Sequence, residues 1–285
     1  MIYRIFCFLI VGFLMACSPA ERPVEETTQV TAEEDSGPDL YQQYMWCNQG
    51  DNYNEETSQA QTARWIELAT EAGVNDWGAF SLIPRVEDPN FDTILGLMWP
   101  SKVAQETDMA LYTNAGVNAK LSEEFPGVGL CGGDQGQLTW GFDAWNSDRT
   151  VAQQSNEPGN TGVGTYSFCS YKEGKEPADL IAVVEGPHAD WIAKFEQENG
   201  PSSYNFKYFR PDFDTATAVR NDPVPAEYDF MWLDAHSSEE DRLAGQAAYD
   251  ATGQDVQAAF DEVATCNVPQ VFDFTLLRAM PGASS

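Results

Sequence analysis

The feature that most constrains the fold of this chain is an internal repeat. At a fixed offset of 137 residues, a group of matches follows without a gap: Phe91-Asp92 with Tyr228-Asp229, Ser101 with Ser238, Tyr112 with Tyr249, and Gly116 with Gly253. Upstream, shorter offsets align Trp65 with Trp191, Arg85 with Arg210, and Cys47 with Cys169, as loops of unequal length would require. Self-similarity of this kind indicates copies of one structural unit. We predict two diverged copies, residues 39–150 and 165–285, joined by a linker over residues 151–164.

Hydrophobic periodicity predicts the same order of elements in each copy: strand, helix, strand, strand, helix, strand. The first copy is predicted to have strands at 41–48, 80–86, 91–99 and 137–142, and helices at 63–72 and 101–125, the second broken near Gly116. The second copy is predicted to have strands at 165–171, 204–210, 228–236 and 270–277, and helices at 187–199 and 239–265. A capping pattern from Ser237 to Glu240 opens the last helix. Residues 180–184 fit either a helical turn or a short strand.

Each copy contains two cysteines, which test this topology. In a βαββαβ unit with sheet order 4-1-3-2, strands one and four are antiparallel neighbours, so a cysteine late in strand one faces one entering strand four. We therefore predict disulfides Cys47–Cys131 and Cys169–Cys266, formed in an oxidising compartment. A structural zinc site is the alternative, but no Cys-x-x-Cys or His-bearing spacing supports it. No other metal site is expected, since the acidic run from Asp51 lacks the calcium-loop pattern.

The element order, the tryptophan-bearing helices and the strand Tyr228-Asp229-Phe230-Met231-Trp232, followed by a Glu-rich helix, resemble the dimeric α+β barrel superfamily. Its members include antibiotic-biosynthesis monooxygenases and EthD-like and NIPSNAP-like proteins, and the resemblance covers roughly residues 40 to 280. It implies an α+β fold in which two ferredoxin-like units close one barrel within a single chain. It also implies a monomer with an internal pseudo-two-fold, and a cavity between sheet and helices or inside the barrel.

The N-terminal residues indicate where the protein resides. Arg4 precedes an apolar run over residues 5–14, which is too short to span a bilayer and has the layout of a secretory signal. Its ending, Leu14-Met15-Ala16-Cys17, resembles a bacterial lipobox, which implies cleavage after residue 16 and lipidation of Cys17. An ordinary signal peptide with a chance cysteine is the alternative. Residues 17–38, rich in Pro, Glu, Thr and Ser, are predicted to form a disordered tether.

Ser18, directly after Cys17, resembles lipoproteins that are not retained on the inner membrane. We therefore expect a lipid-anchored protein of the bacterial cell envelope, at the outer membrane.

Composition narrows the choice of partners. The chain carries 45 acidic against 15 basic residues, a formal charge of −30. Nucleic acid and anionic lipid headgroups require clustered Lys and Arg, so neither is expected as a partner. The expected partners are the membrane, through the lipid on Cys17, and a small-molecule ligand. The motifs of serine hydrolases, P-loops, zinc proteases and dinucleotide folds are absent from the sequence, and no cofactor is expected.

The strand over residues 228–236 holds the strongest candidate site. Its side chains alternate, so Phe230, Trp232, Asp234 and His236 share one face while Met231, Leu233 and Ala235 share the other. We expect the apolar set to pack under the helices and the first set to face the barrel interior. The repeat places Leu97 and Trp99 at the positions of Asp234 and His236, so the polar pair belongs to the second copy alone.

This polar pair predicts acid–base chemistry, with His236 as general base and Asp234 raising its basicity or fixing its tautomer. The alternative is that the strand ends near Asp234 and both side chains are solvated.

The predicted ligand-binding residues are Phe230, Trp232, Trp99, Tyr208 and Arg210. Arg210 could hold a ligand carboxylate or form a structural ion pair with a nearby aspartate. His188, which follows Pro187 at a helix start, is expected to be exposed and structural, since no motif supports a haem-ligand role.

Three functions follow from these observations. The first is a lipid-anchored protein that binds a small, partly apolar molecule in its barrel. The second is a cofactor-independent monooxygenase or isomerase-type enzyme that uses His236 and Asp234. The third is a structural or protein-interaction lipoprotein with a filled barrel.

Overall fold

The computed structural model describes residues 37–132, 139–147, 156–220 and 223–281. The predicted signal peptide with Cys17, nearly all of the tether and much of the linker lie outside these residues. The strands are β1 (Leu40–Gln49), β2 (Gly78–Pro84), β3 (Thr93–Trp99), β4 (Gly129–Cys131), β5 (Thr139–Asn146), β6 (Thr161–Tyr171), β7 (Asn205–Pro211), β8 (Phe230–His236), β9 (Ala264–Cys266) and β10 (Gln270–Arg278). The helices are α1 (Glu55–Glu71), α2 (Lys102–Asn114), α3 (Val117–Glu124), α4 (Pro177–Val183), the π-helical turn η1 (Val184–His188), α5 (Ala189–Asn199), α6 (Glu239–Thr252) and α7 (Gln254–Val263).

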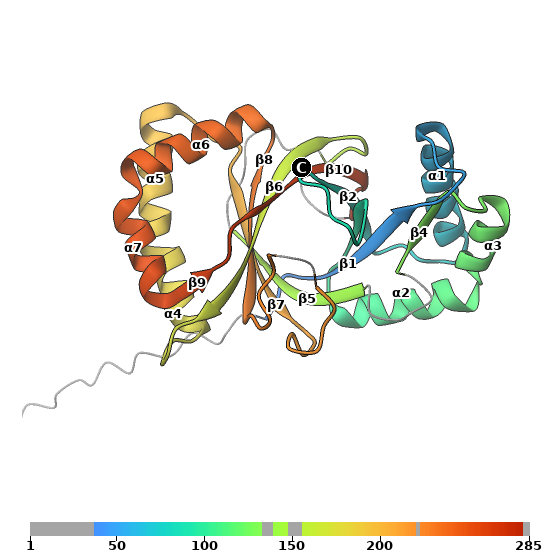
Figure 1. Cartoon of the computed structure of the whole chain (residues 1–285), viewed down its shortest axis with the longest axis horizontal. Coiled ribbons are helices and arrows are strands. Elements are labelled where there is room, and N and C mark those ends of the chain that lie inside the picture. The colour runs from blue at the N-terminus through green and yellow to red at the C-terminus, as the bar shows by residue number, and fades with distance from the viewer. Residues whose placement is uncertain (1–36, 133–138, 148–155, 221–222, 282–285) are drawn as a thin grey trace, which may run out of the picture. The chain divides into compact units, whose positions relative to one another are not determined.

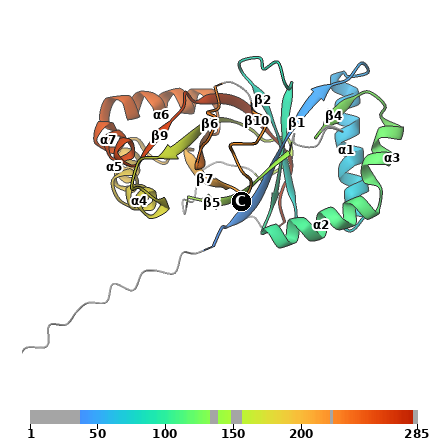
Figure 2. The ribbon, with the colours of Figure 1, turned by 60° about the horizontal axis from the view of Figure 1, so that its bottom comes forward.

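Eight strands close into an antiparallel barrel. Their order is β10-β2-β3-β1-β5-β7-β8-β6, and pairing of β6 with β10 completes the ring. The first half supplies β2-β3-β1-β5 and the second β7-β8-β6-β10, so each half has its own strands in the order 2-3-1-4. The halves join where β5 pairs with β7 and where β10 pairs with β2. Helices α1–α3 lie beside the first half and α4–α7 beside the second (Figures 1 and 2). The predicted mixed α+β class is confirmed.

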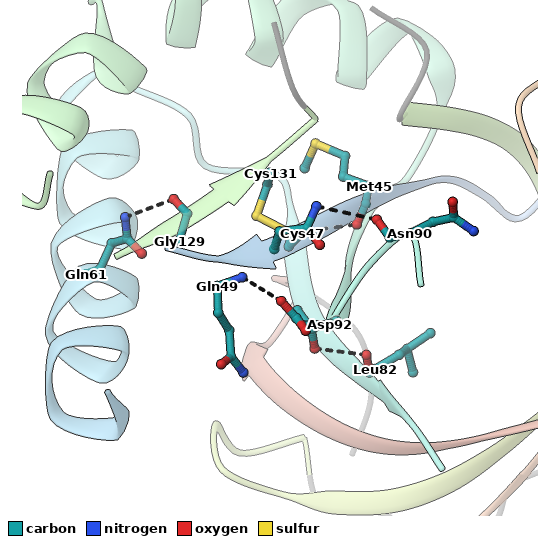
Figure 3. Close-up of a disulfide and its surroundings, with 11 residues drawn as sticks. Met45, Cys47, Gln49, Gln61, Leu82, Asn90, Asp92, Gly129 and Cys131 are labelled. Atoms are coloured by element: carbon teal, nitrogen blue, oxygen red, sulfur yellow. Dashed lines mark hydrogen bonds between the residues drawn. A yellow bond between two sulfur atoms is a disulfide. The ribbon is translucent and has the colours of Figure 1, made fainter. Parts of the chain in front are cut away.

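The predicted disulfides are confirmed in both halves. Cys47 on β1 is bonded to Cys131 on β4, and Cys169 on β6 to Cys266 on β9. Each pair also stands in direct cross-strand register, because β4 and β9 are short strands that precede β5 and β10 and pair with β1 and β6. Figure 3 shows the first disulfide, with Gln61 of α1 donating its amide to the carbonyl oxygen of Gly129 beside it.

Polar contacts at equivalent positions repeat the same local geometry. The Asp92 carboxylate accepts a hydrogen bond from the Gln49 amide at 2.7 Å, and Asp229 accepts one from Tyr171 at the same distance (Figure 3 shows the first). Ser101 caps α2 by accepting from the Ala104 amide, and Ser238 caps α6 by accepting from the Asp241 amide. Asp92 and Asp229, and Ser101 and Ser238, which the 137-residue offset matches, therefore hold matching structural roles.

The alignment of Arg85 with Arg210 was wrong by two residues. Pro84 stands opposite Phe272, and Pro211 stands opposite Phe142, so the position equivalent to Arg210 is Ile83. The two arginines nevertheless make related ion pairs across the two seams. They bind Asp273 at 2.7 Å and Asp143 at 3.0 Å, respectively.

Other differences from prediction concern element boundaries. The helix predicted over 239–265 divides at Gly253 into α6 and α7 and then continues as β9. Its cap is Ser238 and not Ser237, because the Ser237 hydroxyl instead donates to the Asp241 carboxylate. The run over 180–184 is helical and continues through η1, which contains Pro187. Proline lacks the N–H of a regular helical bond, which favours a local change of helix type at this point. Strand β6 begins at Thr161, inside the predicted linker.

The barrel interior is a filled aromatic core drawn from both halves. Tyr44 and Tyr166, at equivalent positions on β1 and β6, meet there with hydroxyl oxygens 3.4 Å apart. Met231 and Leu233 of β8 belong to this core, whereas Phe230 packs with the helices of the second half. The predicted orientation of β8 was therefore wrong. A barrel interior is closed to water on all sides, so it takes the strand's wholly apolar face.

We predict that the Cys47–Cys131 disulfide contributes strongly to stability. It closes a separation of 84 residues, so its removal should free the unfolded chain and lower the free energy of unfolding by on the order of 3 kcal/mol. Urea unfolding of the Cys47→Ala/Cys131→Ala variant measures this loss. Cys169→Ala/Cys266→Ala, with a separation of 97, should lose a similar amount. An unchanged unfolding midpoint in either variant would contradict the prediction.

Candidate functional site

A cavity of about 630 Å³ lies in the second half. It lies between the outer face of β6 and β8 and the helices α5, α6 and α7, which Figure 1 shows beside these strands. Aromatic side chains form much of its wall: Trp191, Phe195, Tyr204, Phe230, Trp232, Tyr249 and Phe260. Polar side chains also reach it, among them Thr165, Ser167, Asp234, His236, Asp241 and Arg242.

In the first half, large side chains fill the space between sheet and helices. Trp99 of β3 is 2% exposed and donates its indole N–H to Asp108 of α2 at 3.2 Å. The 137-residue offset maps Trp99 onto His236 and Asp108 onto Gly245. A bulky hydrogen-bonded pair is thus replaced by an imidazole and a residue without a side chain. At this position the second half therefore has smaller side chains than the first.

Asp234 is held at the cavity wall by two donors. Its Oδ1 accepts from the Tyr204 hydroxyl at 2.8 Å and from the Trp232 indole N–H at 2.8 Å. Its Oδ2 has no hydrogen bond from any described residue. Burial raises the pKa of this carboxyl above its usual range, against the opposing effect of the two hydrogen bonds. One oxygen of Asp234 is therefore fixed by two hydrogen bonds, the other has none from a described residue, and the side chain lines the cavity.

His236 is 8% exposed and lines the same cavity. Its ring lies against the ring of Tyr204, with centroids 5.3 Å apart, and beneath Gly245, where an added Cβ would stand 3.2 Å from Cε1. Within the described part of the chain, no residue forms a hydrogen bond with its ring nitrogens. Burial lowers the pKa of His236 to about 4, although the charge of Asp241 opposes this shift. The imidazole is therefore neutral at neutral pH and offers one acceptor nitrogen.

Asp234 and His236 share one face of β8, as predicted, but that face is turned to the helices and not to the barrel interior. Neither is solvated at a strand end. Tyr204 contacts both, with its hydroxyl on Asp234 and its ring on His236. The carboxylate bonds of Asp234 go to Tyr204 and Trp232, so the catalytic roles of the pair stay a prediction.

His188 was predicted to be exposed, but it is buried. It is 3% exposed, and its Nε2 lies 3.3 Å from the Tyr204 hydroxyl. Rings of Phe206, Trp232 and Phe260 surround it at centroid distances of 4.9–5.9 Å. The prediction placed His188 at the start of a helix, but α4, η1 and α5 form one continuous helical run with a kink at Gly186, so His188 lies within the run and not at its exposed end.

Two of the predicted ligand-binding residues, Phe230 and Trp232, line the cavity. Trp99 lies in the core of the first half. Tyr208 is in hydrogen-bond contact with the Tyr171 hydroxyl at 3.2 Å, and Arg210 pairs with Asp143 above the Trp145 ring. These three do not line the cavity, and the structure assigns Arg210 to an ion pair between the halves. The prediction missed Thr165, Ser167, Tyr204 and Tyr249, because their pattern also suits ordinary strand and helix positions.

A second, smaller space of about 80 Å³ lies at one end of the barrel. It is lined mostly by apolar side chains of the barrel core and by residues of the long loop after β7, including Val219 and Val224. Among the described residues, no group of three or more His, Cys, Asp or Glu side chains is placed to hold a metal ion. No helix in the described ranges has the length and apolar character needed to cross a membrane.

Neither family models nor curated proteins match this chain. Several solved structures are similar to it at low identity. A mutant chlorite dismutase from Candidatus Nitrospira defluvii has 9% identity and a TM-score of 0.46, with 84% of this chain and 92% of the other covered. A candidate monooxygenase from Fusobacterium nucleatum has 9% identity and a TM-score of 0.46, with 88% and 97% covered. Likenesses of this size leave the activity of this chain open.

We predict that His236 makes folding sensitive to mild acid. The unfolded imidazole takes up a proton near pH 6.5 and the folded one only near pH 4, so the free energy of unfolding falls as the pH falls between these values. Relative to His236→Gln, wild type should lose roughly 2 kcal/mol between pH 7 and 4.5, measured by urea unfolding.

The comparison with His236→Gln isolates this effect. The raised pKa of Asp234 makes the folded state take up a proton before the unfolded state does, which increases the free energy of unfolding as the pH falls. This opposing effect is present in both proteins and cancels in the comparison. Equal pH dependence in the two proteins would show that His236 titrates normally.

Proposed function

We propose that this chain is a lipid-anchored protein of the bacterial envelope that binds a small, partly apolar molecule in the cavity of its second half. The observation that carries the proposal is the difference between the halves. Where the first half packs Trp99 against Asp108, the second has His236, Gly245 and a cavity of about 630 Å³. Unfilled space in a core costs stability, so a large cavity at one of two equivalent positions favours a ligand.

The lining supports a ligand that is apolar over most of its surface. Aromatic side chains surround a few polar groups, the composition typical of small-molecule sites. Aromatic side chains pack the barrel interior, and the space at its mouth is much smaller, about 80 Å³. The ligand therefore belongs between the sheet and the helices of the second half, the first of the two locations that the superfamily resemblance implied.

The proposal includes the origin of this asymmetry. The two halves share strand order, disulfide position, helix caps and the Asp92 and Asp229 contacts. These shared features support descent from a duplicated ferredoxin-like βαββαβ unit of the dimeric α+β barrel type. One copy then kept a packed core while the other acquired the cavity.

Lipid anchoring rests on the lipobox ending at Cys17. We expect the exported chain to begin at Cys17 with a lipid attached, and to fractionate with the outer membrane. Mass spectrometry of the N-terminal peptide tests this, with Cys17→Ser as the control that should not be lipidated. An unmodified Cys17 in the mature chain would contradict the anchor and leave the cavity proposal standing.

A second candidate function is a cofactor-independent monooxygenase or isomerase-type enzyme. The observation in its favour is the neutral His236 imidazole, unbonded to any described residue and adjacent to Tyr204 and Asp234 at the cavity wall. Such a group can accept a proton from a bound molecule. If the bound molecule is turned over, His236→Gln should abolish turnover while binding and folding persist. Unchanged turnover would remove His236 from the mechanism.

We predict that native mass spectrometry of the full chain, purified from an oxidising compartment in detergent micelles, detects a non-covalent mass excess that is lost on denaturation. The double variant His236→Trp/Gly245→Asp transplants the first half's Trp99–Asp108 pair into the second half. Because both substitutions add bulk where His236 and Gly245 line the cavity, the variant should carry much less added mass than wild type.

Leu243→Trp is the matched control, because it adds similar bulk on α6 at an exposed position outside the cavity. It should retain the ligand at the wild-type level. If wild type carries no more added mass than the double variant, the binding function is contradicted. That result would favour the third hypothesis, a structural or protein-interaction lipoprotein.

A further inference from the structure

We propose that the cavity selects an organic primary amine, with the ammonium group held between Asp234, His236 and Thr165 and the apolar part against the aromatic wall. This inference rests on the proposed binding function and names the chemical class of its ligand. Its evidence is the charge balance of the lining, the set of unoccupied hydrogen-bond acceptors and the position of the aromatic rings.

The charged side chains of the lining favour a cation. Three carboxylates line the cavity, from Asp234, Asp241 and Asp261, against one guanidinium, that of Arg242. Arg242 is already engaged, since its Nε and Nη2 each donate to Glu239 at 2.8 Å. Among the described residues, no lysine lines the cavity. A ligand anion would therefore find no free cation in the lining, whereas a ligand cation would find carboxylates in excess.

Asp234 is the carboxylate best placed to receive that cation. Asp241 already accepts hydrogen bonds from the hydroxyls of Ser203 and Ser237, and Asp261 accepts one from Gln257. Asp234 has its Oδ2 free of bonds from described residues, while Oδ1 is fixed by Tyr204 and Trp232. A bound ammonium would also offset the cost of keeping this buried carboxylate ionised.

Two further acceptors lie on the same face of the sheet. Thr165 stands directly opposite Asp234 in the β6–β8 register, and its Oγ1 is buried without a hydrogen-bond partner. His236 lies two residues beyond Asp234, is more than nine-tenths buried, and offers a neutral ring nitrogen. A primary ammonium has three N–H donors, and this face provides three acceptors for them.

The aromatic wall suits the remainder of the ligand. Trp232 and Phe260 lie within 5.6 Å of each other, centroid to centroid, and both line the cavity. Trp191 and Tyr249 pack edge-on at 5.1 Å on the side of α5 and α6. Such rings bury apolar surface and also attract a cation through their faces.

The test compares three probes with the same phenethyl skeleton: phenethylamine, phenethyl alcohol and hydrocinnamate. Calorimetric titration of the full-length protein should show the amine binding about tenfold tighter than the alcohol, and the carboxylate weakest. Asp234→Asn keeps an oxygen to accept from Tyr204 and Trp232 but removes the charge. This substitution should lower the affinity for the amine about tenfold and change the affinity for the alcohol less than twofold.

Glu240→Gln is the matched control, since it removes one carboxylate from the exposed first turn of α6 and should leave all three affinities unchanged. Thr165→Val keeps the side-chain shape and should lower the affinity for the amine about threefold. This variant tests the proposal if Asp234→Asn fails to fold. The amine site would be overturned if wild type bound the amine and the alcohol with equal affinity. It would also be overturned if neither Asp234→Asn nor Thr165→Val changed the affinity for the amine.

The outcomes separate this inference from the function on which it rests. If the probes bind without preference and His236→Trp/Gly245→Asp abolishes binding, the cavity function stands and the amine assignment fails. If wild type binds none of the probes at millimolar concentration, the amine assignment also fails. In that case the native mass measurement decides the cavity function, which stands if a non-covalent mass excess is found. If the bound molecule has no basic nitrogen, the amine assignment fails and the cavity function stands.

Discussion

The structure depends on the two seams at which the halves pair, β5 with β7 and β10 with β2. Without them each half would be an open four-stranded sheet with one apolar face and two exposed edges, which is prone to aggregate. Closure removes the edges and turns both apolar faces inward, where Tyr44 and Tyr166 meet in one aromatic core. The Arg85–Asp273 and Arg210–Asp143 pairs reinforce the seams from the exposed side.

Closure also explains why the site lies where it does. The barrel interior belongs to both halves at once, so a change there must suit two packing environments and the core stays filled. The outer face of each sheet packs mainly against helices of its own half, so a change there affects the other half less. The second half has His236 and Gly245 where the first has Trp99 and Asp108. The filled core and the cavity thus lie on opposite surfaces of the sheet.

Much of the architecture could be predicted from the sequence because it repeats. Cysteines at matching places in two copies constrain the strand order, and both predicted disulfides are present. The face of β8 could not be predicted in the same way. Alternation shows that Asp234 and His236 lie together but not on which side, since a barrel wall has two buried faces. His188 was misplaced for another reason: Pro187 was taken as a helix start, whereas the helical run already begins at Pro177.

Tyr204 is a site residue that the alternation of side chains along β8 alone could not predict. It comes from the start of the segment leading into β7, yet it binds Asp234, approaches His188 and packs on His236. These contacts depend on the pairing of β7 with β8, which no local pattern expresses. They fix one Asp234 oxygen and leave the other without a bond from a described residue, so the polarity of the site arises from the sheet and not from a motif. A repeated fold can therefore acquire a specific site through few substitutions, provided that they fall on the face that only one copy uses.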